Sequence, residues 1–270
     1  MEKDILFLNE IELELIDTHT HLYDQAFDGD RKEVVNRAIQ NGISKVILPD
    51  IDSTSRGSLE KLAGEFPGFA YPTIGLHPTS VGIGWEKELE MVLEGIDNNK
   101  HTAIGEIGID CYWSKEFVKE QVVVFEKQLE AASQARLPVI IHSRDATELI
   151  LDSIKRLKHL DLKGVFHAFS GSLETYRQIK ALGNFMFGIG GVVTFKNSKL
   201  PATVLEMDKN SLILETDAPW LTPTPFRGKR NEPAHVQLIA KKIAEIKNCD
   251  IKEIAQTTTT NANRLFKFII

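Results

Sequence analysis

The chain has 270 residues, of which 42% are hydrophobic and 26% charged, and its formal net charge is -6. This length and composition are typical of a globular protein and predict one large domain over residues 1–270. The negative charge gives no overall attraction to phosphate, so a nucleic-acid partner would need a local basic surface or bound cations.

Cysteine placement and hydropathy narrow the class further. Cys111 and Cys249 lie far apart and form no CxxC pair, which argues against a disulfide framework and a thiolate zinc site and favours the cytoplasm. The apolar run after residues 1–4 is short and is broken by Asn9 and Glu10, so it does not predict a signal peptide. No apolar stretch is long enough to cross a bilayer, so we expect no membrane partner.

Strand and helix patterns alternate along the chain. Residues 11–16 alternate apolar and acidic side chains with the period of a strand, and residues 30–41 form an amphipathic helix. Further strands are expected at 43–49, 70–76, 102–109, 137–141, 164–166, 185–190 and 212–214. Further helices are expected at 55–66, 86–98, 115–136, 146–157, 173–182, 200–207, 233–246 and 250–268. About eight strands in regular β-α alternation predict an α/β fold, a closed (β/α)8 TIM barrel.

Polar residues in or just after these strands are His19, His21, His77, Glu106, His142, His167 and Asp217. In a parallel barrel the carboxyl ends of all strands face one mouth, where such folds place their chemistry. A single histidine at a strand end is more often a hydrogen-bonding residue. An ionised Glu106 within an apolar strand, however, is costly unless it is paired or bound to metal. Four of the histidines with the two carboxylates therefore predict a metal site.

The expected ligands are nitrogen and oxygen atoms, which suit Mg²⁺, Mn²⁺ or Zn²⁺ and do not choose among them. A catalytic zinc uses about three protein ligands, so six predict two divalent metal ions. Glu106 has two oxygens and would bridge them. His19, His21 and Asp217 would hold one ion, and His142 with His167 the other.

Seven motifs surround these residues: 17–22 (DTHTHL), 75–78 (GLHP), 105–110 (GEIGID), 141–146 (IHSRDA), 167–171 (HAFSG), 215–219 (ETDAP) and 227–233 (RGKRNEP). Their order and spacing resemble those of the TatD family of metal-dependent deoxyribonucleases. The resemblance implies a barrel of the amidohydrolase superfamily that binds two divalent metals and hydrolyses phosphodiester bonds in DNA. The metal ligands of the family fall on His19, His21, Glu106, His142, His167 and Asp217. Many relatives carry a further histidine where this chain has residues 79–81, so that position is not carried over.

The expected reaction uses a water that the metals activate to hydroxide. Asp217 would take the proton of this nucleophile, and Glu106 would join the ions. We expect a 3′-5′ exonuclease acting on single-stranded ends of DNA. The sequence shows no separate duplex-binding module, which favours strand ends or single strands, but the direction of attack, the strand preference and the choice of DNA or RNA stay open. Native metal and oligomeric state are also open, with a monomer plausible.

Substrate capture needs local positive charge. Arg227, Lys229 and Arg230 cluster after the last strand, and we predict that they contact substrate phosphate. His77 would orient the phosphate or support a metal ligand. Lys196 and Lys199 could also line the mouth, but lysines in such positions are more often solvated loop charges.

Two other functions fit the same residues. A binuclear amidohydrolase would use the same hydroxide on a small-molecule amide, lactone or ester, although many such relatives bridge their metals with a modified lysine where this chain has Glu106. A metal-stabilised scaffold without activity would melt in a metal-dependent way and turn nothing over.

Overall fold

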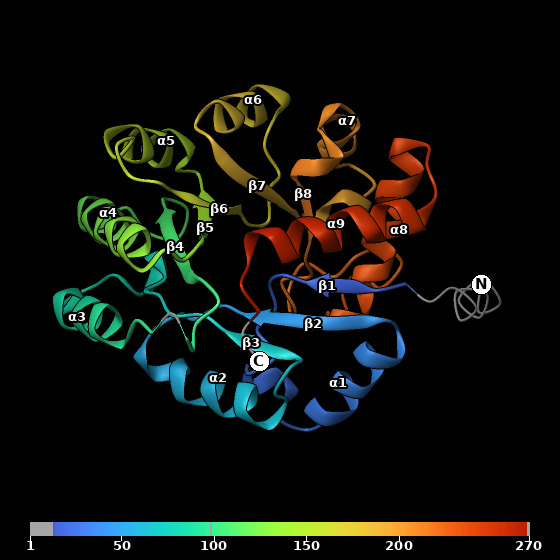
Figure 1. Ribbon diagram of the computed structural model, residues 1–270, viewed down its shortest axis with the longest axis horizontal. Helices are drawn as coiled ribbons and strands as arrows, with labels where there is room; N and C mark the ends of the chain where they lie inside the picture. The colour runs from blue at the N-terminus through green and yellow to red at the C-terminus, as the bar shows by residue number, and fades with distance from the viewer. Residues whose placement is uncertain (1–12, 98, 269–270) are drawn as a thin grey trace.

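The computed structural model describes residues 13–97 and 99–268, in which parallel strands alternate with helices (Figure 1). The strands are β1 (Leu15–Asp17), β2 (Ile43–Leu48), β3 (Ala70–Pro72), β4 (Ile104–Asp110), β5 (Val139–Arg144), β6 (Lys163–Phe166), β7 (Asn184–Ile189) and β8 (Leu212–Leu214). The helices are α1 (Arg31–Gln40), α2 (Ser53–Glu65), α3 (Trp85–Gly95), α4 (Val118–Ala135), α5 (Thr147–Arg156), α6 (Leu173–Ala181), α7 (Leu200–Glu206), α8 (Val236–Lys247) and α9 (Ile251–Leu265).

The strands close into a barrel in sequence order. Parallel ladders join β1 to β3 and β4 to β8. At one seam the amide of Thr18 donates to the carbonyl of Leu214 at 3.0 Å, and at the other the amide of Gly105 donates to the carbonyl of Ile74 at 2.9 Å. Each connection runs through a helix on the outside, as parallel strands require. The predicted (β/α)8 barrel is confirmed.

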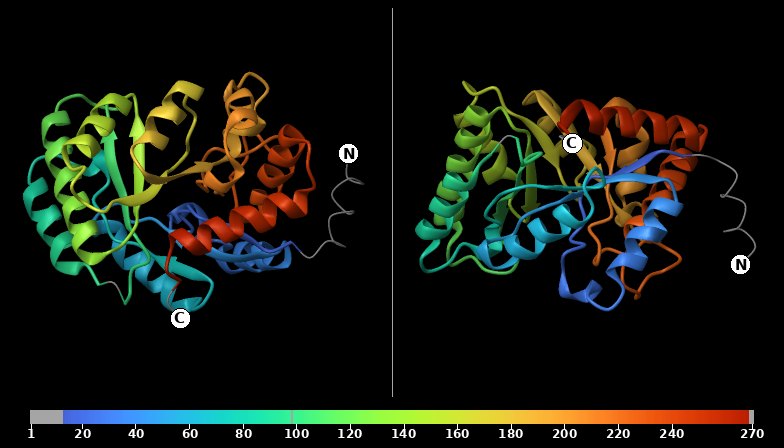
Figure 2. Two further views of the ribbon diagram at one scale, coloured as in Figure 1. Left: turned by 45° about the horizontal axis from the view of Figure 1, so that its top comes forward. Right: turned by 60° about the horizontal axis from the view of Figure 1, so that its bottom comes forward.

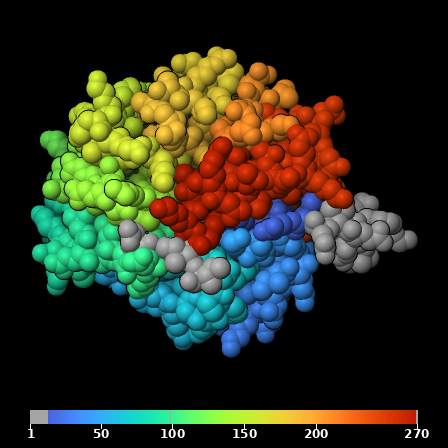
Figure 3. Space-filling model, viewed as in Figure 1, coloured from blue at the N-terminus to red at the C-terminus, as the bar shows by residue number. Residues whose placement is uncertain are grey.

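Helix α9 covers the amino-terminal end of the barrel (Figures 1 and 2). Ala262 and Leu265 of this helix, with Phe266 directly after it, pack against the inward-facing side chains Ile16, Ile47, Ala103, Ile140, Val165, Met186 and Ile213. The side chain of Asn261 donates to the carbonyl of Leu212 at 2.8 Å. In Figure 3 the red atoms of this region lie across the middle of the face. The open mouth is therefore at the carboxyl ends of the strands.

Several element boundaries differ from the prediction; the strand expected over 70–76, for example, is only Ala70–Pro72. The first strand was expected over 11–16, but β1 begins at Leu15, and residues 11 and 12 lie outside the described part. The helix expected from residue 115 begins at Val118 because the preceding loop is held by a carboxylate. Oδ1 of Asp110 accepts the amides of Tyr112 at 2.9 Å and Trp113 at 3.1 Å.

None of the described helices combines the length and the apolar character needed to span a membrane.

Candidate metal centre

The six residues predicted as ligands meet at the open mouth: His19 and His21 after β1, Glu106 in β4, His142 in β5, His167 after β6 and Asp217 after β8. The strands run parallel, so residues far apart in sequence arrive at the same end of the barrel. His77 follows β3 and lies beside them, with Nε2 3.5 Å from Oε1 of Glu106.

Glu106 is the buried centre of this cluster. Its Oε2 lies 3.2 Å from Nε2 of His19, and its Oε1 lies 3.1 Å from Nε2 of His167 and 2.9 Å from Nδ1 of His142. Burial raises the pKa of this carboxyl, but the facing His167, His19 and His77 lower it more, leaving the pKa well below its usual range. Glu106 is therefore ionised, and its two oxygens face different histidines.

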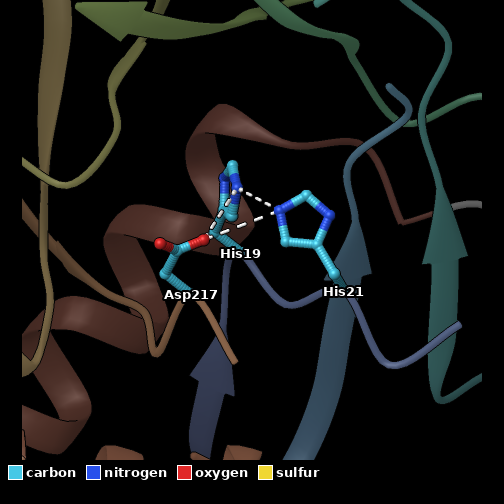
Figure 4. Close-up of side chains that lie close together, drawn as sticks. All are labelled: His19, His21 and Asp217. Atoms are coloured by element: carbon cyan, nitrogen blue, oxygen red, sulfur yellow. Dashed lines mark hydrogen bonds and ion pairs between the residues drawn. The ribbon is translucent and has the colours of Figure 1, made fainter. Parts of the chain in front are cut away.

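Asp217 completes a second group with the first two histidines (Figure 4). Its Oδ1 lies 3.7 Å from Nε2 of His19 and 3.5 Å from Nε2 of His21, and these two nitrogens are 3.2 Å apart. Asp217 has a φ of 57°, a left-handed conformation that is uncommon outside glycine and concentrates at functional sites. Burial raises the pKa of Asp217, but the contact with His21 lowers it to below the ordinary value.

The far nitrogen of His21 has its own partner. Its Nδ1 is 2.7 Å from the hydroxyl of Tyr23, which itself donates to the carbonyl of Pro49 at 2.5 Å. Because that hydroxyl proton is used, Nδ1 of His21 is the donor and Nε2 is left with its lone pair facing the site. A partner of this kind is typical of metal-binding histidines.

A carboxylate holds His142 in the same way, and a second carboxylate lies close to His167 without a hydrogen bond to it. Nε2 of His142 donates to Oδ2 of Asp110 at 2.9 Å, and Nδ1 of His167 lies 3.3 Å from Oε1 of Glu215. Glu215 also accepts the amide of Ala168 at 2.5 Å. No role was predicted from the sequence for Tyr23, Asp110 or Glu215. Both acids lie inside the motifs, Asp110 at the end of β4 and Glu215 directly after β8, and an acid at the end of an apolar strand is a signal that could have been used.

His77 presents a hydrogen to the site. Its Nδ1 accepts the amide of Thr79 at 3.2 Å, so in the neutral ring Nε2 carries the proton and points toward Glu106. Burial lowers the pKa of His77, although Glu106 opposes this, so the neutral form is favoured. His77 is therefore placed as a hydrogen-bond donor at the rim of the cluster.

The donor atoms fit divalent cations. Three groups have their ligand atoms within 4.8 Å of one another: His19 with His21 and Asp217, His19 with Glu106 and His167, and His77 with Glu106 and His142. All are imidazole nitrogens or carboxylate oxygens, the donors that Zn²⁺, Mn²⁺ and Mg²⁺ sites use.

Ring contacts link histidines that the predicted allocation assigns to different ions. His167 stacks on His19 with ring centroids 3.8 Å apart, whereas the centroids of His142 and His167 are 6.0 Å apart. The number of ions and their division among the ligands stay predictions.

The three predicted substrate-binding cations, Arg227, Lys229 and Arg230, differ in how far other residues of the protein already engage them. Arg230 lies 2.7 Å from both carboxylate oxygens of Asp30, which offsets its charge. The guanidinium of Arg227 lies 3.8 Å from the ring centroid of Phe195, and Lys229 is exposed. Substrate contact by these three residues stays a prediction, and Arg227 and Lys229 have the more available charge.

A parallel barrel whose mouth gathers histidines and carboxylates defines the class of barrel hydrolases that depend on divalent metals. The family model described as TatD related DNase matches residues 16–267. The metal-dependent hydrolase YabD of Bacillus subtilis is 40% identical over 254 residues, which cover 94% of this chain and 99% of YabD.

Solved structures agree with this family. YjjV, a TatD homologue from Escherichia coli K12, superposes with a TM-score of 0.88 at 31% identity, covering 95% of this chain and 99% of YjjV. A TatD-family hydrolase from Entamoeba histolytica shares the fold at a TM-score of 0.81 and 23% identity, covering 94% of this chain and 98% of that one. The chain belongs to the TatD family of metal-dependent hydrolases, as the motifs predicted.

Proposed function

We propose that this protein is a deoxyribonuclease that hydrolyses phosphodiester bonds at single-stranded 3′ ends of DNA. The observation that carries the proposal is the buried, ionised Glu106, whose Oε2 faces His19 while its Oε1 faces His142 and His167. One carboxylate facing ligands on both sides supports a pair of ions. Ion pairs of this kind stabilise both the attacking and the leaving oxygen in phosphodiester hydrolysis.

His19, His21 and Asp217 would hold one ion and His142 with His167 the other, with Glu106 between them. Two divalent cations supply Lewis-acid stabilisation of the phosphate and lower the pKa of water. Asp217 accepts the proton of the attacking water, because its lowered pKa keeps it ionised. His77 donates its Nε2 hydrogen to a phosphate oxygen and so orients the substrate.

The test is digestion of end-labelled single-stranded DNA with Mg²⁺, Mn²⁺ or Zn²⁺, with EDTA and a folded Glu106→Gln protein as controls. Stepwise shortening from the 3′ end that disappears in both controls supports the proposal. Duplex DNA and RNA of the same sequence measure strand and sugar preference. Intact DNA with every metal, together with hydrolysis of a panel of lactones and cyclic amides, would replace the nuclease by the small-molecule amidohydrolase.

We also propose a cytoplasmic location, supported by Cys111 and Cys249, which are both free thiols. We further propose that the protein is a monomer, which sedimentation velocity of the purified protein tests.

A further inference from the structure

Exposed aromatic side chains lie in the loop that follows β4. Tyr112 is 55% exposed and Trp113 is 70% exposed. Their rings meet edge to face, with centroids 5.1 Å apart. The guanidinium of Arg144 lies 3.8 Å from the ring centroid of Tyr112 and 5.3 Å from that of Trp113. Single exposed aromatic residues are common, but these three side chains combine π faces with a positive charge in one place.

This cluster is attached directly to the candidate metal centre. Asp110 accepts the Nε2 hydrogen of His142 with Oδ2, and it accepts the backbone amides of Tyr112 and Trp113 with Oδ1. Arg144 lies two residues after His142 on β5, so both side chains project to the same side of the strand. One carboxylate therefore fixes the aromatic loop relative to a predicted metal ligand.

A further exposed aromatic residue lies on the opposite side of the mouth. Trp220 is 47% exposed, and its ring meets that of His21 edge to face with centroids 5.0 Å apart. It follows β8, which closes against β1, whereas Tyr112 and Trp113 follow β4. In a barrel of eight strands in sequence order these positions are half a turn apart. The predicted ligands therefore lie between two exposed aromatic sites.

The chemistry of these sites matches an unpaired nucleotide. Every base has a π face that can stack on an aromatic ring, whereas the bases of a duplex are already stacked on one another. Arg144 adds a cation that can contact the base or its phosphate. Because the chain has a net charge of -6, overall electrostatic attraction cannot supply the affinity for DNA.

We propose that Tyr112, Trp113 and Arg144 form a platform that stacks one unpaired base of a DNA strand, and that Trp220 stacks a base on the other side of the scissile phosphate. This inference rests on the proposed function and names the residues that select single strands. Base stacking on an aromatic ring changes affinity by roughly 5- to 150-fold.

The test measures binding of metal-loaded protein to a fluorescent phosphorothioate oligothymidylate, which resists hydrolysis. We expect Trp113→Ala and Trp220→Ala each to weaken binding by roughly 5- to 150-fold, and Trp113→Phe, which keeps a π face, to stay near the wild type. Leu205→Ala is the matched control, because Leu205 is a 54% exposed apolar residue on α7. Equal affinity of the alanine variants and the wild type would overturn the platform, as would equal losses in Trp113→Phe and Trp113→Ala.

A second readout uses the three tryptophans of the chain. In the Trp85→Phe/Trp220→Phe protein only Trp113 remains, and in the Trp85→Phe/Trp113→Phe protein only Trp220 remains. We expect the oligothymidylate to quench the fluorescence of each. An abasic strand of the same length should leave it bright, and equal quenching by both strands would contradict stacking. If DNA quenches the tryptophan but is not cleaved with any metal, the proposed nuclease activity is refuted and the proposed base stacking is supported. Cleavage by a wild type that shows no quenching would refute the platform and keep the nuclease.

Discussion

The two ends of the barrel are built from the same eight strands, but one end is filled with apolar side chains and the other with polar ones. At the amino-terminal end, inward-facing aliphatic side chains pack against Leu265, the last residue of α9, and against Phe266 after it. At the carboxyl end, buried histidines surround Glu106. The described residues with a buried side-chain atom that lacks a hydrogen-bond partner lie at this carboxyl end: His19, Thr20, Asp50, Arg56, Ser143, His167 and Glu215.

This difference separates stability from chemistry. A buried polar group without a partner costs about 1–3 kcal/mol, so the unpartnered groups at the mouth lower the free energy of unfolding. The same groups are available to bind a ligand. The closed end offsets that cost by burying apolar surface. Changes at the mouth should therefore alter metal binding and hydrolysis, and changes at the closed end should alter stability.

The largest effect is expected at Glu106. Glu106→Gln removes the charge that faces both sides of the cluster, so bound metal should fall and hydrolysis of DNA should fall by more than the roughly 10²–10⁴-fold typical of losing a general base. Metal content by mass spectrometry and initial rates measure this. Exposed Glu245→Gln is the control. Full metal content with a rate within tenfold of the wild type would contradict a central role for Glu106.

At the closed end, Phe266→Ala should lower the free energy of unfolding by about 3–5 kcal/mol, because Phe266 is fully buried between α9 and the barrel interior. Urea denaturation measures the loss, with exposed Leu205→Ala as the matched control. The rate per folded molecule should be unchanged. A folded Phe266→Ala protein without activity would break the separation of the two ends.

A smaller effect is expected at Glu215, which faces Nδ1 of His167 and accepts the amide of Ala168. Glu215→Gln keeps the shape but removes the charge that orients the imidazole, so metal affinity should fall about 10- to 100-fold. Competition with a chelator of known affinity measures the change. An affinity equal to that of the wild type would mean that His167 needs no such partner.

The smallest effect concerns pH and His101, a buried histidine near the amino end of β4. Burial lowers the pKa of His101 to about 4. Because this value is below that of the unfolded chain, about 6.5, the stability contribution is complete above pH 6.5 and is lost as the pH falls toward 4. His101→Gln should flatten thermal stability between these values. If thermal stability of the variant falls with decreasing pH as it does in the wild type, then groups other than His101 control the loss of stability in acid.

The sequence was sufficient for the barrel and for the residues at its mouth. Apolar runs and helical stripes located every strand, and the parallel arrangement then brought His19, Glu106 and Asp217 together. The sequence did not predict features that depend on contacts between distant residues, such as the start of α4. Asp110 accepts two loop amides and so delays the start of α4, and no local pattern encodes this.

The side-chain geometry of the site was also beyond the sequence. The stacking of His167 on His19 follows from where β6 and β1 lie across the barrel, and the contact between Tyr23 and His21 follows from the path of the loop after β1. A spacing pattern predicts which strand ends carry ligands, but the orientation of each ring is set by tertiary packing.

Helix α9 also constrains how the protein can fold during synthesis. The ribosome makes it after all eight strands, yet its Leu265 and the following Phe266 complete the barrel interior. The hydroxyl of Thr259 donates to the carbonyl of Glu14 near the start of the described chain. A nascent chain halted before α9 would present this apolar interior to solvent. Such exposed surface is prone to aggregation and is what chaperones bind, so we expect the barrel to reach full stability only after α9 has left the ribosomal tunnel.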